Sequence, residues 1–344
     1  MNDTPVGLRI TVAGVGAIGG FIGARLAASG APVNVLARGQ TLAALRRQGL
    51  RLVTDAKHLD LPVTASDTAA DFGVQDLLII AVKGPSLPVL APSLRPLIGP
   101  QTTILPTMNG VPWWFCQTGQ GNAPFALKSV DPDGNIADNL PVAQTLGCVV
   151  HIGASCDAPG VVRHAMGKEL ILGDAVGGFS PRAEAIAALF ARAGLDIKRS
   201  SDIRQDIWFK LWGNLTMNPV SALTGATIDR LLGDPLVSEF CSAAMREAAV
   251  IGDRIGCHVD QRPEDRHAIT FRLGAFKTSM LQDVEAGRPI ELDSIVGATY
   301  EIGHHFGLET PCIDAIFGLT RLMARTRGLY PDAPDAAGPT PAAG

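Results

Sequence analysis

The stretch I-T-V-A-G-V-G-A-I-G-G-F-I-G-A-R-L-A, residues 10–27, decides the fold of this chain. A short β-branched run is followed at once by three glycines that open a run with helical apolar spacing. In a strand–turn–helix unit, these glycines permit the tight turn, the approach of a pyrophosphate and the close packing of helix on sheet. A glycine cluster that serves packing alone is the alternative. We predict a dinucleotide site at the start of the helix, formed by Gly14, Gly16, Ala17, Ile18 and Gly19.

The chain around this motif alternates between two kinds of apolar pattern. Strand-like runs occur at 9–13, 33–37, 76–82 and 102–107, and helix-like runs at 17–29 and 41–48. This alternation predicts an α/β fold with a Rossmann-type, doubly wound parallel sheet. Two further strand-like runs between 145 and 175, separated by D-A-P-G, predict added antiparallel strands, and a helix (182–193) and a strand (195–198) follow.

The second half of the chain has a different texture. After about residue 200 the apolar pattern is nearly all helical. We therefore expect a Rossmann-like dinucleotide-binding domain over 1–200 and an all-α domain for substrate and catalysis over 201–328. Residues 329–344 are rich in proline and alanine, and we expect this tail to be disordered.

Composition excludes several classes of function. The chain has 344 residues, 47% hydrophobic and 18% charged, with a net charge of −4 and no block of lysine and arginine, so neither nucleic acid nor a membrane is an expected partner. The N-terminus does not resemble a signal peptide, and no apolar run is long enough to span a bilayer. Six scattered cysteines predict reduced thiols in a cytoplasmic protein. The seven histidines lack metal-ligand spacing, and we expect no metal site.

The residue after the second predicted strand distinguishes between the two nicotinamide dinucleotides. An acid there binds the ribose hydroxyls of NAD and repels a 2′-phosphate, but here the strand V-N-V-L-A ends at Arg38. A guanidinium suits a phosphate dianion, so the sequence predicts NADP(H), with Gln40 as a weaker companion. An ordinary surface arginine is the alternative.

A second informative stretch is D-I-W-F-K-L-W-G-N-L-T-M-N-P, residues 206–219. Lys210, Asn214 and Asn218 are spaced four residues apart, so they share one face of a helix that is otherwise largely apolar. So sparse a polar stripe favours the lining of a cleft, although a half-buried helix with internally satisfied amides would give the same pattern. Reduction of a ketone places negative charge on its oxygen, and a lysine whose pKa is lowered by burial can stabilise that charge and donate the proton.

Taken together, these motifs resemble those of the ketopantoate reductases (2-dehydropantoate 2-reductases). The resemblance runs from about residue 8 to 325. It is carried by the glycine motif and by five further segments: A-V-K at 81–83, N-G at 109–110, P-G-V-V-R-H at 159–164, K-L-W-G-N-L-T-M-N-P at 210–219 and S-M-L-Q-D-V-E-A-G-R-P-I-E-L-D at 279–293.

The resemblance implies NADPH-dependent reduction of 2-dehydropantoate to (R)-pantoate, on the route to pantothenate and coenzyme A. It makes Lys210 the general acid and Glu291 a second active-site residue that orders the substrate hydroxyl or the lysine. It also implies that Ser279 bonds the substrate carboxylate, and it assigns Lys83 to the cofactor. The substrate contacts that it implies are Asn109, which also meets the cofactor, Asn214, Asn218 and Ser279.

One region departs from the family pattern. The segment 111–135 is longer than in the shorter members, and Trp113 and Trp114 follow directly on the Asn109 loop. These indoles either cap the mouth of the active site or pack the segment against its own domain. Another small 2-oxo or hydroxy acid is therefore an alternative substrate, and a non-catalytic NADP(H)-sensing protein is a second alternative that has no use for the lysine and glutamate. A helical second domain often supports dimers, so a homodimer is among the expectations.

Overall fold

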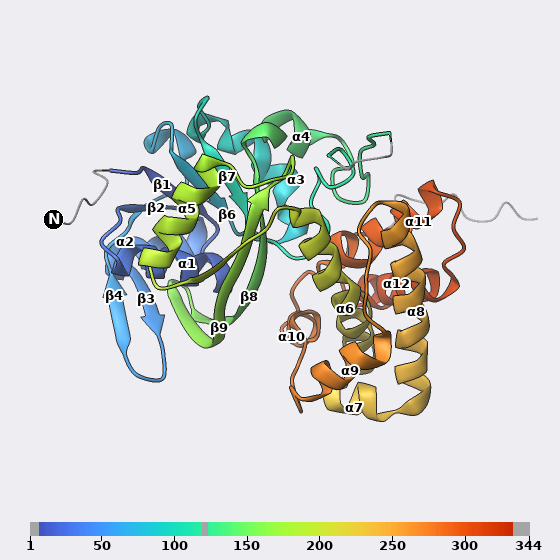
Figure 1. Cartoon of the computed structure of the whole chain (residues 1–344). Helices are drawn as coiled ribbons and strands as arrows, with labels where there is room; N and C mark the ends of the chain where they lie inside the picture. The colour runs from blue at the N-terminus through green and yellow to red at the C-terminus, as the bar shows by residue number, and fades with distance from the viewer. Residues whose placement is uncertain (1–6, 119–122, 333–344) are drawn as a thin grey trace, which may run out of the picture.

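The computed structural model describes residues 7–118 and 123–332. Figure 1 shows a part built on sheets, formed by the N-terminal half of the chain, beside a part built on helices, formed by the C-terminal half. Within the described residues no helix is long and apolar enough to cross a membrane.

The parallel sheet carries the glycine motif. Its strand order is β5-β2-β1-β6-β7, and every neighbouring pair is parallel. Every residue of β1, β6 and β7 is buried, as expected for strands covered on both faces. The strands are β1 (Ile10–Ala13), β2 (Val33–Leu36), β5 (Thr64–Ser66), β6 (Leu77–Ile80) and β7 (Thr103–Pro106). This order confirms the predicted Rossmann-type sheet.

Short helices connect and cover these strands. The absence of a side chain at Gly19 lets helix α1 pack closely, because a Cβ there would lie 2.1 Å from the carbonyl oxygen of Gly14 and 2.6 Å from the Cβ of Ala81. The connecting elements are α1 (Ala17–Ala28), α2 (Gly39–Gln48), η1 (Ala69–Asp71), η2 (Gly84–Ser86), α3 (Leu87–Leu90) and η3 (Ala91–Leu97).

A second sheet lies beside the first, with the order β10-β9-β3-β4 and with β8 paired to β9. The predicted antiparallel pair is present as β8 and β9, but β9 also pairs in parallel with β3 and β10. The pattern gave no indication of β3, β4 or β5, which are short. The elements are β3 (Leu50–Val53), β4 (His58–Leu61), α4 (Asn135–Asn139), η4 (Val142–Gln144), β8 (Leu146–Ala158), β9 (Val161–Asp174), α5 (Pro181–Arg192) and β10 (Asp196–Arg199).

The helical part is organised around α6. The side chain of Asp202 caps this helix by accepting from the backbone N–H groups of Arg204 and Gln205, and α8, α10 and α12 pack against it. The elements are α6 (Ile203–Thr224), α7 (Ile228–Gly233), α8 (Pro235–Arg254), α9 (Pro263–Phe271), α10 (Ser279–Glu285), the π-helix η5 (Asp293–Gly297), α11 (Ala298–His305) and α12 (Pro311–Thr326).

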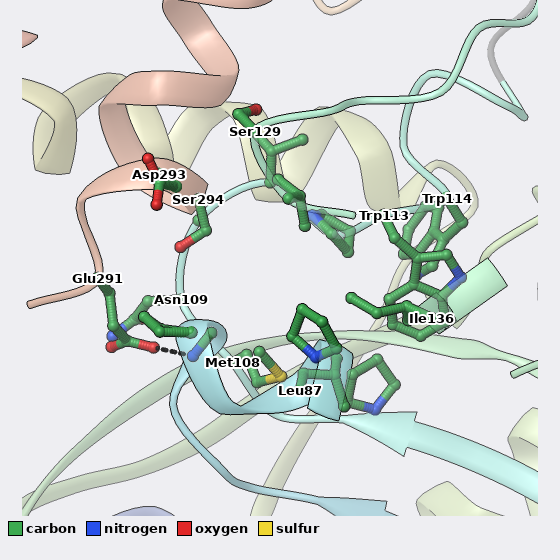
Figure 2. Close-up of a pocket in the computed structure, with 18 of the residues that line it drawn as sticks. Leu87, Met108, Asn109, Trp113, Trp114, Ser129, Ile136, Glu291, Asp293 and Ser294 are labelled. Carbon is green, nitrogen blue, oxygen red and sulfur yellow. Dashed lines mark hydrogen bonds between the residues drawn. The ribbon is translucent and has the colours of Figure 1, made fainter. Parts of the chain in front are cut away.

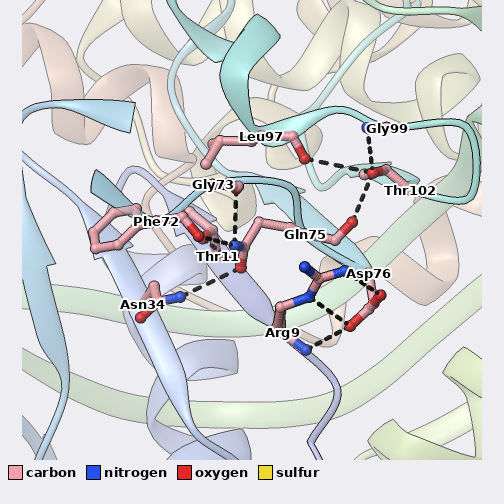
Figure 3. Close-up of polar contacts among 10 residues, drawn as sticks. All are labelled: Arg9, Thr11, Asn34, Phe72, Gly73, Gln75, Asp76, Leu97, Gly99 and Thr102. Atoms are coloured by element: carbon pink, nitrogen blue, oxygen red, sulfur yellow. Dashed lines mark hydrogen bonds and ion pairs between the residues drawn. The ribbon is translucent and has the colours of Figure 1, made fainter. Parts of the chain in front are cut away.

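At the edge where β1, β6 and β7 begin, a buried amide joins the strands (Figure 3). The Gln75 side chain donates to the carbonyl oxygens of Phe72 and Gly73, at 2.9 and 3.0 Å, and accepts from Thr11 and Asn34. Its donors and its acceptor oxygen are therefore all engaged. The Thr102 hydroxyl donates to the Gln75 carbonyl at 2.6 Å and ties this edge to β7.

Two features bear on predictions about loops and the tail. Trp113 and Trp114 are both buried in the core, so their indoles pack inside the protein rather than over the mouth of a cleft. Leu329 is also buried, and the Tyr330 hydroxyl donates to Asp293, so the first residues of the tail expected to be disordered are packed. The remainder of that tail, 333–344, lies outside the described residues, as do 119–122 of the long segment.

Candidate active site

The glycine motif borders a hollow at the edge where the parallel strands end. Gly14 has φ +92°, and a Cβ there would lie 2.7 Å from Val82, so a side chain would be both strained and obstructed. A Cβ at Gly16 would meet nothing within 4 Å. This open backbone at the N-terminus of α1 fits a pyrophosphate, because the first N–H groups of a helix have no partner within it.

Arg38 lies on the same hollow, directly after β2. It is exposed, stands at the N-cap of α2 and lines the hollow together with Thr41 and Asp67. Within the described ranges its guanidinium has no hydrogen-bond or ion-pair partner. Gln40 is exposed as well but does not line the hollow. The residues present thus fit a dinucleotide, with a cation placed beyond the second strand.

A second hollow, here called the lysine cleft, lies between the sheets and α6. Asn109, Val150 and Lys210 border it, and the Lys210 ammonium donates to Asn109 Oδ1 at 2.9 Å and to the Val150 carbonyl at 2.7 Å. The lysine belongs to the helical part, whereas both acceptors belong to the part built on sheets. The two parts therefore position one ammonium jointly.

Burial changes the acidity of this ammonium. It lowers the pKa of Lys210 from the ordinary 10.5 to about 8, because desolvation disfavours the charged form. The charges of Cys148 and Glu291 act in the opposite direction. An ammonium with a pKa near 8 can donate a proton at neutral pH far more readily than an exposed lysine.

The predicted polar stripe of α6 lines the lysine cleft. Asn214 and Asn218 border it with Lys210, and Ser279, the first residue of α10, lines it as well. In the part of the chain that the structure describes, neither amide side chain has a hydrogen-bond partner. The cleft therefore brings together the predicted substrate-side residues with unoccupied amide donors and acceptors, and the predicted cofactor residue Ile18 lines it too.

Glu291 lies on the other side of Asn109. Its carboxylate accepts from the Gly84 N–H at 3.0 Å, and burial raises its pKa above the ordinary value, although that hydrogen bond acts to lower it. No hydrogen bond joins it to Lys210, so the two act on each other through charge in this structure. Glu291 does not line the lysine cleft.

Lys83 is held away from both hollows. Its ammonium pairs with Asp283 of α10 and donates to the Pro289 carbonyl at 3.3 Å, and Arg288 Nε donates to the same carboxylate at 3.0 Å. The contact with a cofactor that the resemblance implies for Lys83 would require this ion pair to open. In this structure Lys83 joins the sheet-based part to the helical part.

Glu291 faces a third hollow, here called the inner pocket, of about 230 Å3. Figure 2 shows Asn109 and Glu291 at one end of this pocket and Trp113, Trp114 and Ile136 at the other. The lining is largely apolar. Four buried polar atoms on its lining residues have no hydrogen-bond partner within residues 7–118 and 123–332: Nε1 of Trp113, Nε1 of Trp114, Oγ of Ser129 and Oγ of Ser294. The segment that departs from the family pattern thus builds a wall of this pocket.

Sequence reasoning missed Arg266, which also lines the lysine cleft. It lies in P-E-D-R-H, a stretch that is typical of the exposed first turn of a helix, so its pattern gives no sign of a cleft. Gly213 and His151 were missed as well. No cluster of three or more histidine, cysteine, aspartate or glutamate side chains that could hold a metal ion occurs among the described residues.

A dinucleotide-type hollow beside a cleft with a buried lysine defines an oxidoreductase of the nicotinamide-dependent class. The family model described as Ketopantoate reductase PanE/ApbA matches residues 10–177, and its C-terminal counterpart matches residues 202–324. The chain therefore belongs to the ketopantoate reductase family.

Individual relatives agree over nearly the whole chain. A 2-dehydropantoate 2-reductase from Mesorhizobium japonicum is 39% identical over 94% of this chain and 100% of that protein. A solved structure from Ralstonia solanacearum MolK2 is 55% identical, with a TM-score of 0.90, over 94% of this chain and 99% of that one. A D-mandelate dehydrogenase solved with NADH and anilino(oxo)acetate shares the fold at 20% identity, with a TM-score of 0.80, over 93% of this chain and 99% of that one.

Proposed function

We propose that this protein catalyses the NADPH-dependent reduction of 2-dehydropantoate to (R)-pantoate, with Lys210 as the general acid. The observation that carries the proposal is the Lys210 ammonium, which is held by Asn109 and Val150 in a cleft that also presents Asn214, Asn218 and Ser279. The name of the Mesorhizobium relative supports the substrate.

In this mechanism a dinucleotide held by the Gly14–Gly16 turn and Arg38 would supply the hydride that the ketone carbon accepts. Lys210 stabilises the negative charge that develops on the ketone oxygen and donates its proton there, so the C=O bond becomes C–OH and the lysine is left as a neutral amine. Asn109 orients the ammonium before the reaction. Asn214 and Asn218 orient the substrate without adding charge, and the amine regains its proton from solvent.

We further propose that Arg38 selects NADPH over NADH. It is exposed at the glycine-motif hollow without a partner among the described residues, and a guanidinium matches the geometry of a 2′-phosphate. Lys83 would join the cofactor contacts only after its ion pair with Asp283 opens. A homodimer and a cytoplasmic location remain predictions.

The test follows the oxidation of NADPH at its absorbance band with 2-dehydropantoate and with a panel of other small 2-oxo acids. The proposal expects fast turnover of 2-dehydropantoate and slow turnover of the others. Fast turnover of a different member of the panel would discard the substrate and retain the mechanism. Binding of NADPH without turnover of any 2-oxo acid would favour the sensing alternative.

A reductase of another 2-oxo acid is the second candidate. One observation favours it: the apolar inner pocket adjoins Asn109 and Glu291 and has room for a larger side chain. The D-mandelate dehydrogenase has the same fold and was solved with anilino(oxo)acetate. At 20% identity, however, this likeness supports the architecture only. Widening the pocket with Trp113→Leu would then shift the preference toward bulkier 2-oxo acids.

A further inference from the structure

Arg266, on α9, directs its guanidinium toward α6 within the lysine cleft. A Cβ at Gly213 would lie 3.2 Å from Arg266 Nε, so the absence of a side chain there makes room for the guanidinium. The guanidinium carbon also lies 5.1 Å from the ring centre of Phe209. Arg266 thus rests against α6 three residues beyond Lys210, about 4.5 Å along the axis at 1.5 Å per residue.

This guanidinium has no acceptor among the described residues. The contrast with Arg204 is informative. Arg204 is buried, whereas Arg266 is partly buried, and Arg204 donates to the carbonyl oxygens of Phe115 and Ile255, at 2.9 and 3.1 Å. Burial lowers the pKa of Arg266, and no carboxylate opposes that effect. A desolvated cation without a partner is costly, so its donors are available to a ligand.

The other residues of the lysine cleft indicate the charge of that ligand. Among the residues that the structure describes, the cleft is lined by two cations, Lys210 and Arg266, and by no aspartate or glutamate. His151 lies there too. Burial is the main cause that lowers its pKa, and the charges of Lys210 and Arg266 act in the same direction, against that of Glu169. A cleft with this balance favours an anionic substrate.

We infer that Arg266 binds the carboxylate of the 2-oxo acid substrate, while Lys210 faces its ketone oxygen. The inference rests on the proposed function and adds to it the residue that recognises the acid. In a 2-oxo acid the carboxylate and the ketone are on adjacent carbons, so two cations that line the same cleft can engage both groups. The planar guanidinium can engage both carboxylate oxygens, and the Ser279 hydroxyl can add a third hydrogen bond.

Stacking on Phe209 alone is the competing explanation of Arg266. A cation–π contact engages one face of the guanidinium and leaves its N–H donors at the edges unused. The two explanations differ in what they predict for an uncharged substrate. A carboxylate-binding arginine affects the acid alone, whereas a structural arginine affects all substrates equally.

The experiment measures kcat and KM for the 2-oxo acid that the wild type reduces fastest and for its methyl ester. For Arg266→Met we expect the KM of the acid to rise about 10- to 150-fold, the effect of one charge-assisted bidentate contact. The kcat/KM of the ester and the affinity for NADPH should change less than threefold. Arg266→Lys should recover part of the loss, because it restores the charge without the planar fork.

Two further variants control the result. Arg272→Met removes an exposed arginine just after α9 and should leave both substrates unaffected. Gly213→Ala places a methyl group against the Arg266 guanidinium and should raise the KM of the acid by less than Arg266→Met does. An unchanged KM for the acid in Arg266→Met, or equal losses for acid and ester, would overturn the inference.

A binding measurement separates this inference from the proposed function. Oxamate carries a carboxylate beside a carbonyl that is not readily reduced, and its binding to the NADPH complex can be followed by calorimetry. If the wild type reduced no 2-oxo acid but bound oxamate, and Arg266→Met abolished that binding, the carboxylate assignment would stand and the proposed reaction would fall. Oxamate binding that survives in Arg266→Met would overturn the assignment.

Discussion

At the edge of the parallel sheet where the strands begin, the Gln75 amide uses both of its donors and its acceptor oxygen on neighbouring groups. At the opposite edge and in the adjoining cleft, Arg38, Asn214 and Arg266 have no partner among the described residues. Polar groups removed from water in proteins are almost always satisfied, so the two partly buried side chains, Asn214 and Arg266, are exceptions, whereas Arg38 is exposed. The first edge therefore holds the fold together, whereas the second retains donors for ligands that the chain itself does not supply.

Among the changes that test this comparison, removal of the Lys210 ammonium should have the largest effect, and that effect should be on the rate of reduction. Lys210→Met is expected to lower kcat/KM for the reduction about 10²- to 10⁴-fold, because proton donation to the ketone oxygen is lost. NADPH affinity, measured by fluorescence titration, should stay within twofold, since Lys210 lies in the other hollow. Lys57→Met, at an exposed position, is the control. Full activity in Lys210→Met would remove the lysine from the mechanism.

At the edge of the sheet where the strands begin, loss of the Gln75 amide should lower the stability of the protein and leave its activity unchanged. Gln75→Leu keeps the side-chain volume but leaves the Phe72 and Gly73 carbonyls and the Thr11 and Asn34 donors with one partner fewer. We expect the free energy of unfolding, from urea denaturation, to fall by about 2–4 kcal/mol. The same change at the exposed Gln101 should cost less than about 0.5 kcal/mol. Similar losses at both positions would mean that the buried network contributes nothing measurable.

At the edge of the sheet that carries the glycine motif, loss of Arg38 should change the affinity for the cofactor and the choice between NADPH and NADH. Arg38→Ala is expected to weaken NADPH binding by about 1.5–3 kcal/mol, or roughly 10- to 150-fold, through loss of a charge-assisted contact with the 2′-phosphate. NADH lacks that phosphate and should bind nearly as before. Titration of both cofactors tests this, with Arg47→Ala on the exposed face of α2 as the matched control. Equal losses for both cofactors would refute the role of Arg38.

The smallest expected effect is a dependence of kcat/KM on pH, which follows from the lowered pKa of Lys210. The protonated form is the donor, so kcat/KM for reduction should be flat below about pH 7 and fall about tenfold per unit above the pKa of about 8. In the direction of alcohol oxidation the neutral amine is required, and the limb should be reversed. Any residual activity of Lys210→Met should lack this limb. A limb near pH 10.5 would indicate an ammonium that burial does not affect.

Local patterns were enough to predict the first half of the fold. The runs around β1, α1, β2, β6 and β7 each carry their own apolar period and turn residues, so the parallel sheet could be predicted from sequence. Strand β3 could not, because four residues give little periodicity and its partner β9 begins more than a hundred residues later. The mixed second sheet depends on such non-local pairing.

The residues of the candidate site likewise fall into those that local sequence predicts and those that it does not. Lys210, Asn214 and Asn218 are predictable because a helix places residues four apart on one face, and all three line the lysine cleft. Ser279 and Glu291 depended on the family resemblance. Arg266 was missed because its role depends on which helix packs opposite it, and the gap at Gly213 that receives it has no signature in the sequence of α9.

The Val150 carbonyl, which accepts from Lys210 at 2.7 Å, has a consequence for mutational surveys of this enzyme. A peptide carbonyl is present whichever amino acid occupies the position, so exchanging the Val150 side chain leaves the acceptor in place. A scan of substitutions would therefore detect the role of Asn109, whose side chain accepts from Lys210, but would not detect that of the Val150 carbonyl on β8. The constraint on β8 falls instead on strand register, and insertion or deletion of a single residue before Val150 would displace the oxygen from the lysine.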